Sequence, residues 1–188
     1  MHLIQPEAVL ETSRLWLEPL HPSHASVLYE FLQSPAIYTF IPEDPPISLE
    51  ALTTRYQRLS SRRSPDGQEI WLNWAMRQRR EGAYVGLLQA TVYSDANAYF
   101  AYTLFPLFWK QGYAREGCKR VMDLLLKDYQ VHLIMAEIDT RNVASIKLIE
   151  SLGFQRVATK LNADFFKGST SHEYRYELLR HHEVTPST

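Results

Sequence analysis

The segment that most constrains the fold runs from Phe108 to Leu126, where a small-residue turn opens directly into an amphipathic helix. Gly112 and Ala114 in this turn allow backbone N–H groups to converge, and the start of the helix adds roughly half a positive charge. A phosphate fits such a cradle without any basic side chain. Taken alone, a glycine turn of this kind is more often an ordinary strand-to-helix loop.

A second strand-to-helix junction follows at Asn142. The residues from Val143 to Leu152 predict a helix with a polar start, and Gly153 is suited to end it in the left-handed conformation. Because this junction comes after the first in a regular order of strands and helices, the pair favours phosphate binding over the ordinary-loop interpretation.

The remaining segments predict a mixed sheet. Alternating apolar residues predict an antiparallel meander over 70–76, 84–93 and 98–105, and the strand at 133–139, reached through a helix, is expected to run parallel to the strand before it. Other predicted elements are a strand at 14–20, helices at 22–32, 48–59, 114–129 and 143–152, and a final strand pair at 154–161 and 173–179. The fold class is therefore α/β (α+β), with a mixed, mostly antiparallel sheet of about seven strands, helices on both faces and a splay before the 133–139 strand.

Length and charge limit the organisation and the partners. The 188 residues, of which 45% are hydrophobic, are expected to form one domain over 1–188, with a core of about 10–180 and a flexible tail over 181–188. The net charge of −1 lacks the field on which sequence-independent nucleic-acid binding relies, so no nucleic-acid partner is expected. His181 and His182 have no companion ligands at metal spacing, so no metal is expected.

The setting is expected to be cytoplasmic and reducing. Cys118 is the single cysteine, the first residues do not resemble a signal peptide, and no apolar run has membrane-spanning length. Cys118 falls on the apolar stripe of its helix and is interpreted as a packed residue. Arg55, Arg58 and Arg62 share one helix face, which is interpreted as solvated, the alternative being contact with an acidic substrate.

Three motifs carry a resemblance to a known family. They are Thr12-Ser-Arg-Leu-Trp-Leu17, Phe108-Trp-Lys-Gln-Gly-Tyr-Ala-Arg-Glu116, and Asn142-Val-Ala-Ser145 with Leu152-Gly-Phe154. The chain resembles the GNAT acetyltransferases over about residues 10–179, and among them the ribosomal-protein-alanine type, which acts on N-terminal amines. The resemblance implies a GNAT-like fold and acetyl-CoA as cosubstrate, without a metal.

The resemblance also implies where acetyl-CoA binds. Its pyrophosphate is expected on the backbone of the cradle, and its pantetheine arm on the strand end and on the second junction. The expected cofactor-binding residues are Leu104, Phe105, Lys110, Gln111, Gly112, Tyr113, Ala114, Arg115 and Asn142. Lys110 stands where that subgroup often has glycine, so the backbone must reach its conformation without glycine's freedom. A lysine there also offers the pyrophosphate a charge-assisted hydrogen bond.

The catalytic residues depart from the family pattern. A tyrosine of the second helix often serves as the acid, but that position is Ile149, and the resemblance implies Ser145 as the substitute. The cradle-side strand often carries a carboxylate base, but that position is Tyr99. Asp164 falls where the ribosomal type places its carboxylate, and Asp164 or a water molecule is therefore expected to accept the proton of the amine.

The acceptor is expected to be a primary amine, with a protein or peptide N-terminal α-amine preferred. At neutral pH, making a lysine ε-amine neutral costs roughly 3 to 3.5 kcal/mol more than making an α-amine neutral. The alternatives are a small-molecule amine such as a polyamine, an amino acid or an antibiotic, and a module that binds acetyl-CoA without turnover. The acceptor groove is expected between residues 40–66 and the last hairpin, and a homodimer is compatible with the sequence.

Overall fold

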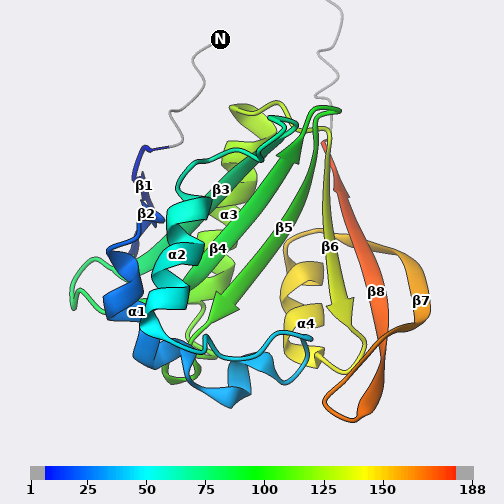
Figure 1. Cartoon of the computed structure of the whole chain (residues 1–188). Helices are drawn as coiled ribbons and strands as arrows, with labels where there is room; N and C mark the ends of the chain where they lie inside the picture. Colours follow the sequence, from blue (N-terminus) through cyan, green and yellow to red (C-terminus); the bar gives the residue numbers. More distant parts are fainter. Residues whose placement is uncertain (1–6, 181–188) are drawn as a thin grey trace, which may run out of the picture.

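A twisted sheet with helices on both faces forms the body of the computed structural model, which describes residues 7–180 (Figure 1). The strand order is β1-β2-β3-β4-β5-β6-β8-β7, and every neighbouring pair is antiparallel except β5 and β6. The strands are β1 (Leu10–Glu11), β2 (Leu15–Pro19), β3 (Glu69–Gln78), β4 (Tyr84–Tyr93), β5 (Asn97–Leu104), β6 (Leu133–Asp139), β7 (Gln155–Phe166) and β8 (Ser169–Leu179). The helices are α1 (His24–Leu32), α2 (Leu49–Leu59), α3 (Tyr113–Lys127) and α4 (Val143–Ser151), with 3-10 turns at Pro35–Tyr38 and Pro106–Phe108.

The predicted mixed, mostly antiparallel sheet is confirmed, with eight strands rather than seven. The additional strand is β1, a two-residue edge segment that pairs with β2 and is too short to show an alternating pattern. The predicted helix caps are also present, because the Ser48 side chain accepts a hydrogen bond from the Ala51 N–H and Gly153 has a φ of +94°. The tail expected over 181–188 lies outside the described residues.

The splay between β5 and β6 is the feature that opens the sheet. The parallel ladder begins at Asn97 and Leu133 and ends at Tyr99 and Met135, after which the two strands diverge (Figure 1). From residue 100 to 104, β5 therefore has a strand partner only on its β4 side. Since every second residue of a strand turns its N–H and C=O outward, this edge presents unpaired backbone groups to the splay.

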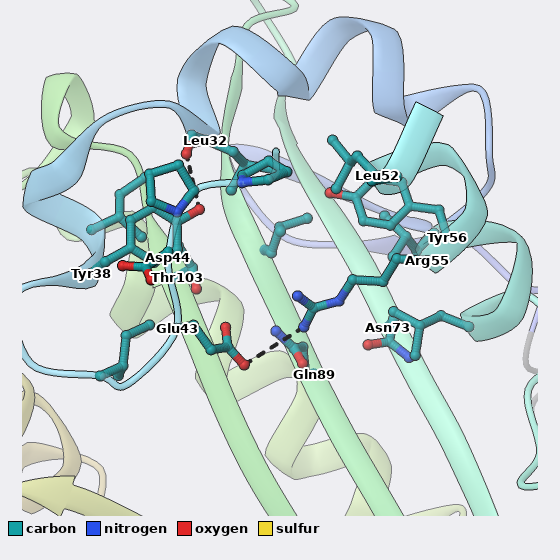
Figure 2. Close-up of a pocket in the computed structure, with 18 of the residues that line it drawn as sticks. Leu32, Tyr38, Glu43, Asp44, Leu52, Arg55, Tyr56, Asn73, Gln89 and Thr103 are labelled. Carbon is teal, nitrogen blue, oxygen red and sulfur yellow. Dashed lines mark hydrogen bonds and ion pairs between the residues drawn. The ribbon is translucent and has the colours of Figure 1, made fainter. Parts of the chain in front are cut away.

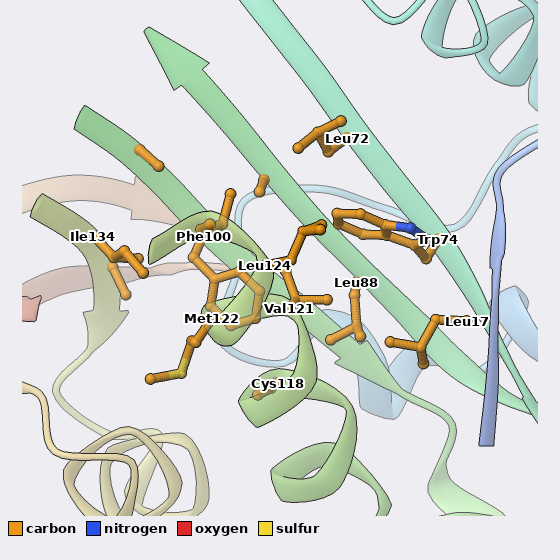
Figure 3. Packing of buried hydrophobic residues seen from close by; sticks show 14 of the residues in the cluster. Leu17, Leu72, Trp74, Leu88, Phe100, Cys118, Val121, Met122, Leu124 and Ile134 are labelled. Carbon is orange, nitrogen blue, oxygen red and sulfur yellow. The ribbon is translucent and has the colours of Figure 1, made fainter. Parts of the chain in front are cut away.

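Each face of the sheet is covered by an apolar core of its own. On one face, α3 packs Cys118 and Val121 against the strands (Figure 3), and these two residues and Leu125 of the same helix are fully buried. On the other face, α1 and α2 pack around Phe105, whose ring stacks on Phe31 at 4.9 Å. The two cores therefore pack against the strands β2 to β5 from both sides. Burial raises the pKa of the Cys118 thiol, as expected of a packed residue.

The interpretation of Arg55, Arg58 and Arg62 as one solvated face is confirmed for Arg55 and Arg58, which are exposed, and is wrong for Arg62. Arg62 is only 7% exposed, and its guanidinium donates to the Glu7 carboxylate and to the Leu20 carbonyl. Arg58 lies over the Trp71 ring, and Arg55 lines a cavity. Arg62 lies beyond Leu59, the last residue of α2, and has a φ of +62°, so the helical spacing that relates Arg55 to Arg58 does not extend to it. None of the helices within residues 7–180 is both long and apolar enough to span a bilayer.

Candidate active site

The cradle between β5 and α3 has the backbone geometry of an anion site. Lys110 and Gly112 both adopt left-handed conformations, with φ of +60° and +81°, and Gly112 begins α3 without a side-chain cap. Within the described part of the chain, no hydrogen bond uses the backbone N–H groups of residues 110 to 115. Unpaired N–H groups at a helix start are suited to phosphate oxygens.

The turn between β1 and β2 fixes this cradle through a clasp, by which we mean the contacts of Thr12, Ser13 and Arg14 with Glu116. The Glu116 carboxylate accepts hydrogen bonds from the Thr12 hydroxyl at 2.6 Å, the Ser13 hydroxyl at 3.0 Å, and the Arg14 N–H and Nε at 2.8 and 2.6 Å. Arg14 also donates to the Gln111 carbonyl at 3.0 Å and lies over the Tyr113 ring. These bonds hold the pKa of Glu116 below its ordinary value against the opposing effect of burial. The clasp explains why the Thr12-Ser-Arg14 motif accompanies the cradle motif in the sequence.

Charged side chains of both signs surround a hollow beside the cradle. It has a volume of about 520 Å³, and it is lined by the cations Arg14, Arg115, Lys119 and Arg120 and by the carboxylates Glu11, Glu116 and Asp123. Each carboxylate is paired with a cation, since Glu116 binds Arg14, Glu11 lies 3.7 Å from Arg79 and Asp123 lies 3.4 Å from Lys127, so Arg115, Lys119 and Arg120 are left to attract an anion. The hollow and the cradle together could hold an extended phosphorylated molecule.

The end of β5 is tied to the cradle. The Trp109 indole N–H donates to the Leu104 carbonyl at 2.7 Å. The Phe105 N–H donates to the Val85 carbonyl of β4 at 2.9 Å, so alternation turns the Leu104 N–H toward the splay. Phe105 is also fully buried. The role expected of Phe105 in binding a cofactor arm is therefore corrected, since its N–H and its side chain are both used inside the protein.

The second junction brings α4 to the other side of the splay. The Asn142 carboxamide oxygen caps α4 by accepting the Ser145 N–H at 3.1 Å, which leaves the carboxamide N–H groups for a ligand. The Tyr102 hydroxyl crosses from β5 and donates to the Ser145 carbonyl at 3.3 Å. Ser145 is half-buried, and none of the hydrogen bonds within residues 7–180 uses its hydroxyl. Ile149 is fully buried, in agreement with its lack of a polar role.

An ion pair between the buried Asp139 and the exposed Arg141 fixes the turn that carries Asn142. The Asp139 carboxylate accepts two hydrogen bonds from the Arg141 guanidinium, at 2.9 and 2.6 Å, and one from the Ser171 hydroxyl at 2.7 Å. These bonds lower the pKa of Asp139 to about 2, although burial acts in the opposite direction. The chain from β6 to α4 is thereby anchored to β8.

A cavity of about 350 Å³ lies on the opposite face of the sheet, between α2, the loop before it and the strands β3 to β5 (Figure 2). Its floor carries Asn73, Gln89 and Thr103, and Arg55 and Glu43 face each other across it with 3.8 Å between their charged atoms. Its apolar walls include Leu20, Leu32, Ile37, Ile41, Pro45, Leu52 and Leu59. Cavities of ~300 to 1,000 Å³ with a few convergent polar groups are typical of sites for small molecules or side chains.

The expected acceptor groove between residues 40–66 and the last hairpin agrees with this cavity. The hairpin contributes Lys167, whose ammonium donates to the carbonyls of Ile41 and Glu43, at 2.9 Å each, and lies 3.5 Å from the Asp44 carboxylate. The hairpin thus holds the loop that covers the cavity.

Comparison with known proteins identifies the family. A model of the acetyltransferase (GNAT) domain matches residues 14–155, which include the cradle, the splay and α4. The chain belongs to the GNAT acetyltransferase family. It is an acetyl-CoA-dependent N-acetyltransferase, so the interpretation as a binding module without turnover is set aside.

Relatives within the family differ in the acceptors that their names state. The FsC-acetyl coenzyme A-N(2)-transacetylase of Aspergillus fumigatus is 25% identical over 94% of this chain and 78% of its own length. A ribosomal-protein-S5-alanine acetyltransferase from Vibrio fischeri superposes with a TM-score of 0.80 at 16% identity, covering 92% of this chain and 97% of that one. Spermidine N-acetyltransferase from Vibrio cholerae, solved with CoA and spermine, gives 0.77 at 20% identity, covering 90% and 97%. These two structures share the fold with this GNAT chain.

The cradle fits the cosubstrate of a GNAT enzyme. The N–H groups of residues 110 to 115 and the neighbouring cations match the charge of a pyrophosphate, and the open edge of β5 matches an amide-bearing arm. Within residues 7–180, no group of three or more His, Cys, Asp or Glu is arranged to hold a metal ion.

Glu137 is a second carboxylate that could accept a proton at the splay, and the sequence did not point to it. It lies on β6 at the edge of the splay, and the Tyr99 hydroxyl donates to its carboxylate at 3.3 Å. Register and alternation place Tyr99 on the same face as Gln89, which is the face of the cavity. A carboxylate five residues before the Asn142 junction is the sequence signal that could have identified it, because β6 residues of that parity face the acceptor side.

Asp164, the carboxylate expected from the sequence, lies further from the splay than Glu137 does. It is exposed on β7, its carboxylate accepts the Phe165 N–H at 2.7 Å, and β8 separates β7 from β6. Two strand spacings place it roughly 10 Å from β6. Its negative charge nevertheless contributes, after burial and Glu137, to raising the pKa of Glu173 on the strand between them.

Proposed function

We propose that this GNAT enzyme transfers the acetyl group of acetyl-CoA to a primary α-amine, with the N-terminal α-amine of a peptide or protein as the preferred acceptor. The observation that carries the proposal is the splay, which frees the edge of β5: the cradle follows the end of this strand, and its Thr103 lines the cavity. A thioester held along β5 is then accessible to an amine from the cavity face and to α4 from the opposite face.

The residues of the cradle bind the cosubstrate in this proposal. The backbone of Lys110, Gln111, Gly112, Tyr113, Ala114 and Arg115 holds the pyrophosphate, and the Lys110 ammonium adds a charge-assisted hydrogen bond. The Leu104 N–H and the Asn142 carboxamide hold the pantetheine arm. The Leu104 N–H, or a neighbouring N–H of the same open edge, polarises the thioester carbonyl.

Transfer occurs directly within a ternary complex. The neutral amine attacks the carbonyl carbon, a C–N bond forms, and the C–S bond breaks. Ser145 donates its hydroxyl proton to the departing sulfur, and the proton lost by the amine passes to a carboxylate, directly or through water. No covalent enzyme intermediate is required.

We assign the accepting carboxylate to Glu137, with Asp164 as the alternative. Glu137 borders the splay on the acceptor face, whereas Asp164 lies two strands further out. A base must come within hydrogen-bond reach of the proton or reach it through one water molecule. Replacement of each residue by its amide distinguishes them, since only the catalytic carboxylate's amide variant loses most of kcat at neutral pH.

An α-amine agrees with the charges of the acceptor face. The cavity carboxylates Glu43 and Asp44 each lie near a cation, Arg55 and Lys167, so the cavity offers little free negative charge to a polyamine. A small-molecule amine with a single reactive nitrogen remains the second candidate, because the cavity volume suits a small molecule.

The test is an acceptor screen that follows thiol release from acetyl-CoA. N-terminal peptides, the same peptides with a blocked α-amine, free amino acids and spermidine are compared. We expect turnover with unblocked peptides and none with blocked ones. Ser145→Ala should lower kcat at least about tenfold without weakening acetyl-CoA binding. Turnover with spermidine but with no peptide would overturn the preferred acceptor, and unchanged turnover in Ser145→Ala would remove that residue from the mechanism.

The proposal includes one acetyltransferase domain over about residues 10–180 and a cytoplasmic location. Its support is the continuous sheet across the described residues and the single, buried Cys118, which forms no disulfide within the chain.

A further inference from the structure

The cavity on the acceptor face contains a buried hydroxyl without a partner. Tyr56 is only 3% exposed and is one of the residues that line the cavity, and its buried hydroxyl has no hydrogen bond to any described residue. The similar Tyr38 hydroxyl, by contrast, donates to the Leu32 carbonyl at 2.9 Å. A buried phenol that is left unpaired destabilises the protein, which indicates that a bound molecule supplies its partner.

The partner of Tyr56 must be a hydrogen-bond acceptor. Burial raises the pKa of the Tyr56 phenol, so it stays protonated and donates. Arg55, the next residue of α2, brings a cation into the same cavity (Figure 2). Its charged atoms lie 3.8 Å from those of Glu43 and both side chains are about half exposed, at 50% and 56%, so a ligand carboxylate can share the guanidinium with Glu43. A guanidinium and a phenol O–H together favour a carboxylate.

The floor of the cavity gives the distance between this carboxylate and the reacting amine. Asn73, Gln89 and Ala101 are direct register partners across β3, β4 and β5, and Ala101 borders the splay. None of the hydrogen bonds within residues 7–180 uses the side chains of Asn73 or Gln89, so this amide row is available to amide groups of a ligand. One to two strand spacings separate the splay from the floor below α2, which is roughly 5–10 Å.

We propose that the acceptor is an α-amine that carries a carboxylate roughly 5–10 Å from the reacting nitrogen, held by Arg55 and Tyr56, with amide groups lying over Gln89 and Asn73. Free di- and tripeptides, and N-terminal segments with an acidic side chain at the second or third residue, have this chemistry. The inference rests on the proposed function and specifies which α-amines it selects. Polyamines and carboxylate-free amines are poor acceptors.

The first experiment measures binding and does not depend on turnover. The protein loaded with CoA is titrated calorimetrically with the tripeptide Ala-Ala-Leu as its free acid and as its C-terminal amide. We expect the free acid to bind about tenfold more tightly. In Arg55→Gln the two forms should bind equally, while acetyl-CoA affinity stays unchanged. The matched control is Arg58→Gln, which removes the neighbouring arginine over Trp71 and should keep the preference.

A second variant separates ligand binding from folding. Tyr56→Phe removes a hydroxyl that has no partner in the protein, so the melting temperature should stay the same or rise, whereas the free acid should bind several-fold more weakly. A merely structural hydroxyl would lower the melting temperature and leave binding unchanged.

The outcomes distinguish the two proposals. Equal binding of acid and amide, no detectable binding of either, or a preference that survives Arg55→Gln would overturn the carboxylate inference. A binding preference without acetylation of either peptide would support the carboxylate site and refute the proposed peptide acetylation. Acetylation of both peptides with equal kcat/KM would support the proposed function and refute the inference.

Discussion

Replacing Lys110 by glycine should make the protein more stable and its cosubstrate binding weaker. Lys110 is an exposed residue with a φ of +60°, which lies in the left-handed region. Residues other than glycine adopt this backbone conformation at a cost of about 1–2 kcal/mol. Glycine removes this cost but adds about 0.5–1 kcal/mol of backbone entropy loss on folding. The net gain is about 0.5 kcal/mol, which corresponds to about 1–2 °C in melting temperature for a chain of this length.

The same substitution removes the Lys110 ammonium from the cradle. An ammonium beside a phosphate adds a charge-assisted hydrogen bond, which at this exposed position we take as about 1 to 1.4 kcal/mol, or roughly a five- to tenfold increase in the Kd for acetyl-CoA. The two effects have opposite signs because the strain belongs to the backbone and the benefit belongs to the side chain.

The assay combines thermal unfolding with calorimetric titration of acetyl-CoA. Ala96→Gly is the matched control, since Ala96 has the same φ of +60° in a turn between β4 and β5 and carries no charge. It should gain similar stability without a change in Kd. An unchanged Kd in Lys110→Gly would refute the phosphate contact, and a lower melting temperature would refute the account of backbone strain.

Three further predictions concern the clasp, the sheet and the Asp139–Arg141 ion pair. Arg14→Leu leaves the Glu116 carboxylate uncompensated beside the cradle and should weaken acetyl-CoA binding about tenfold in a calorimetric titration, with the loss partly restored in high salt; binding as tight as in the parent protein would argue against the clasp. Gly86→Ala should destabilise the protein by at least about 2 kcal/mol in urea unfolding, because a Cβ there would lie 2.1 Å from the Thr103 carbonyl oxygen; a change below that would mean that β5 yields easily. Asp139, whose pKa is lowered to about 2, contributes stability that is present above its ordinary pKa and is lost as the pH falls from about 4 toward 2; Asp139→Asn should flatten the acid limb of a stability-versus-pH curve, and an unaltered limb would contradict this contribution.

Local patterns in the sequence determined most of the fold and the backbone turn of the cradle. The glycine turn at Gly112, the capping residues Ser48 and Asn142 and the alternating strands each depend on neighbours within a few residues, and the structure places them as predicted. Lys110 in the left-handed conformation was also expected from its place in the cradle. Such features follow from backbone sterics and short-range hydrogen bonds, which the sequence specifies directly.

Tertiary structure alone decided which distant side chains meet. The clasp joins residues 12–14 to Glu116, the Tyr99 hydroxyl reaches Glu137 across the vertex of the splay, and Tyr56 lies without a partner in the acceptor cavity. Of the three arginines expected on one helix face, Arg58 stacks on Trp71 and Arg55 enters the cavity, whereas Arg62 lies beyond the end of α2 and is buried. The periodicity of a helix fixes the direction of a side chain relative to its own axis, whereas its burial, charge partner and role depend on the strands and loops that the whole chain packs against it.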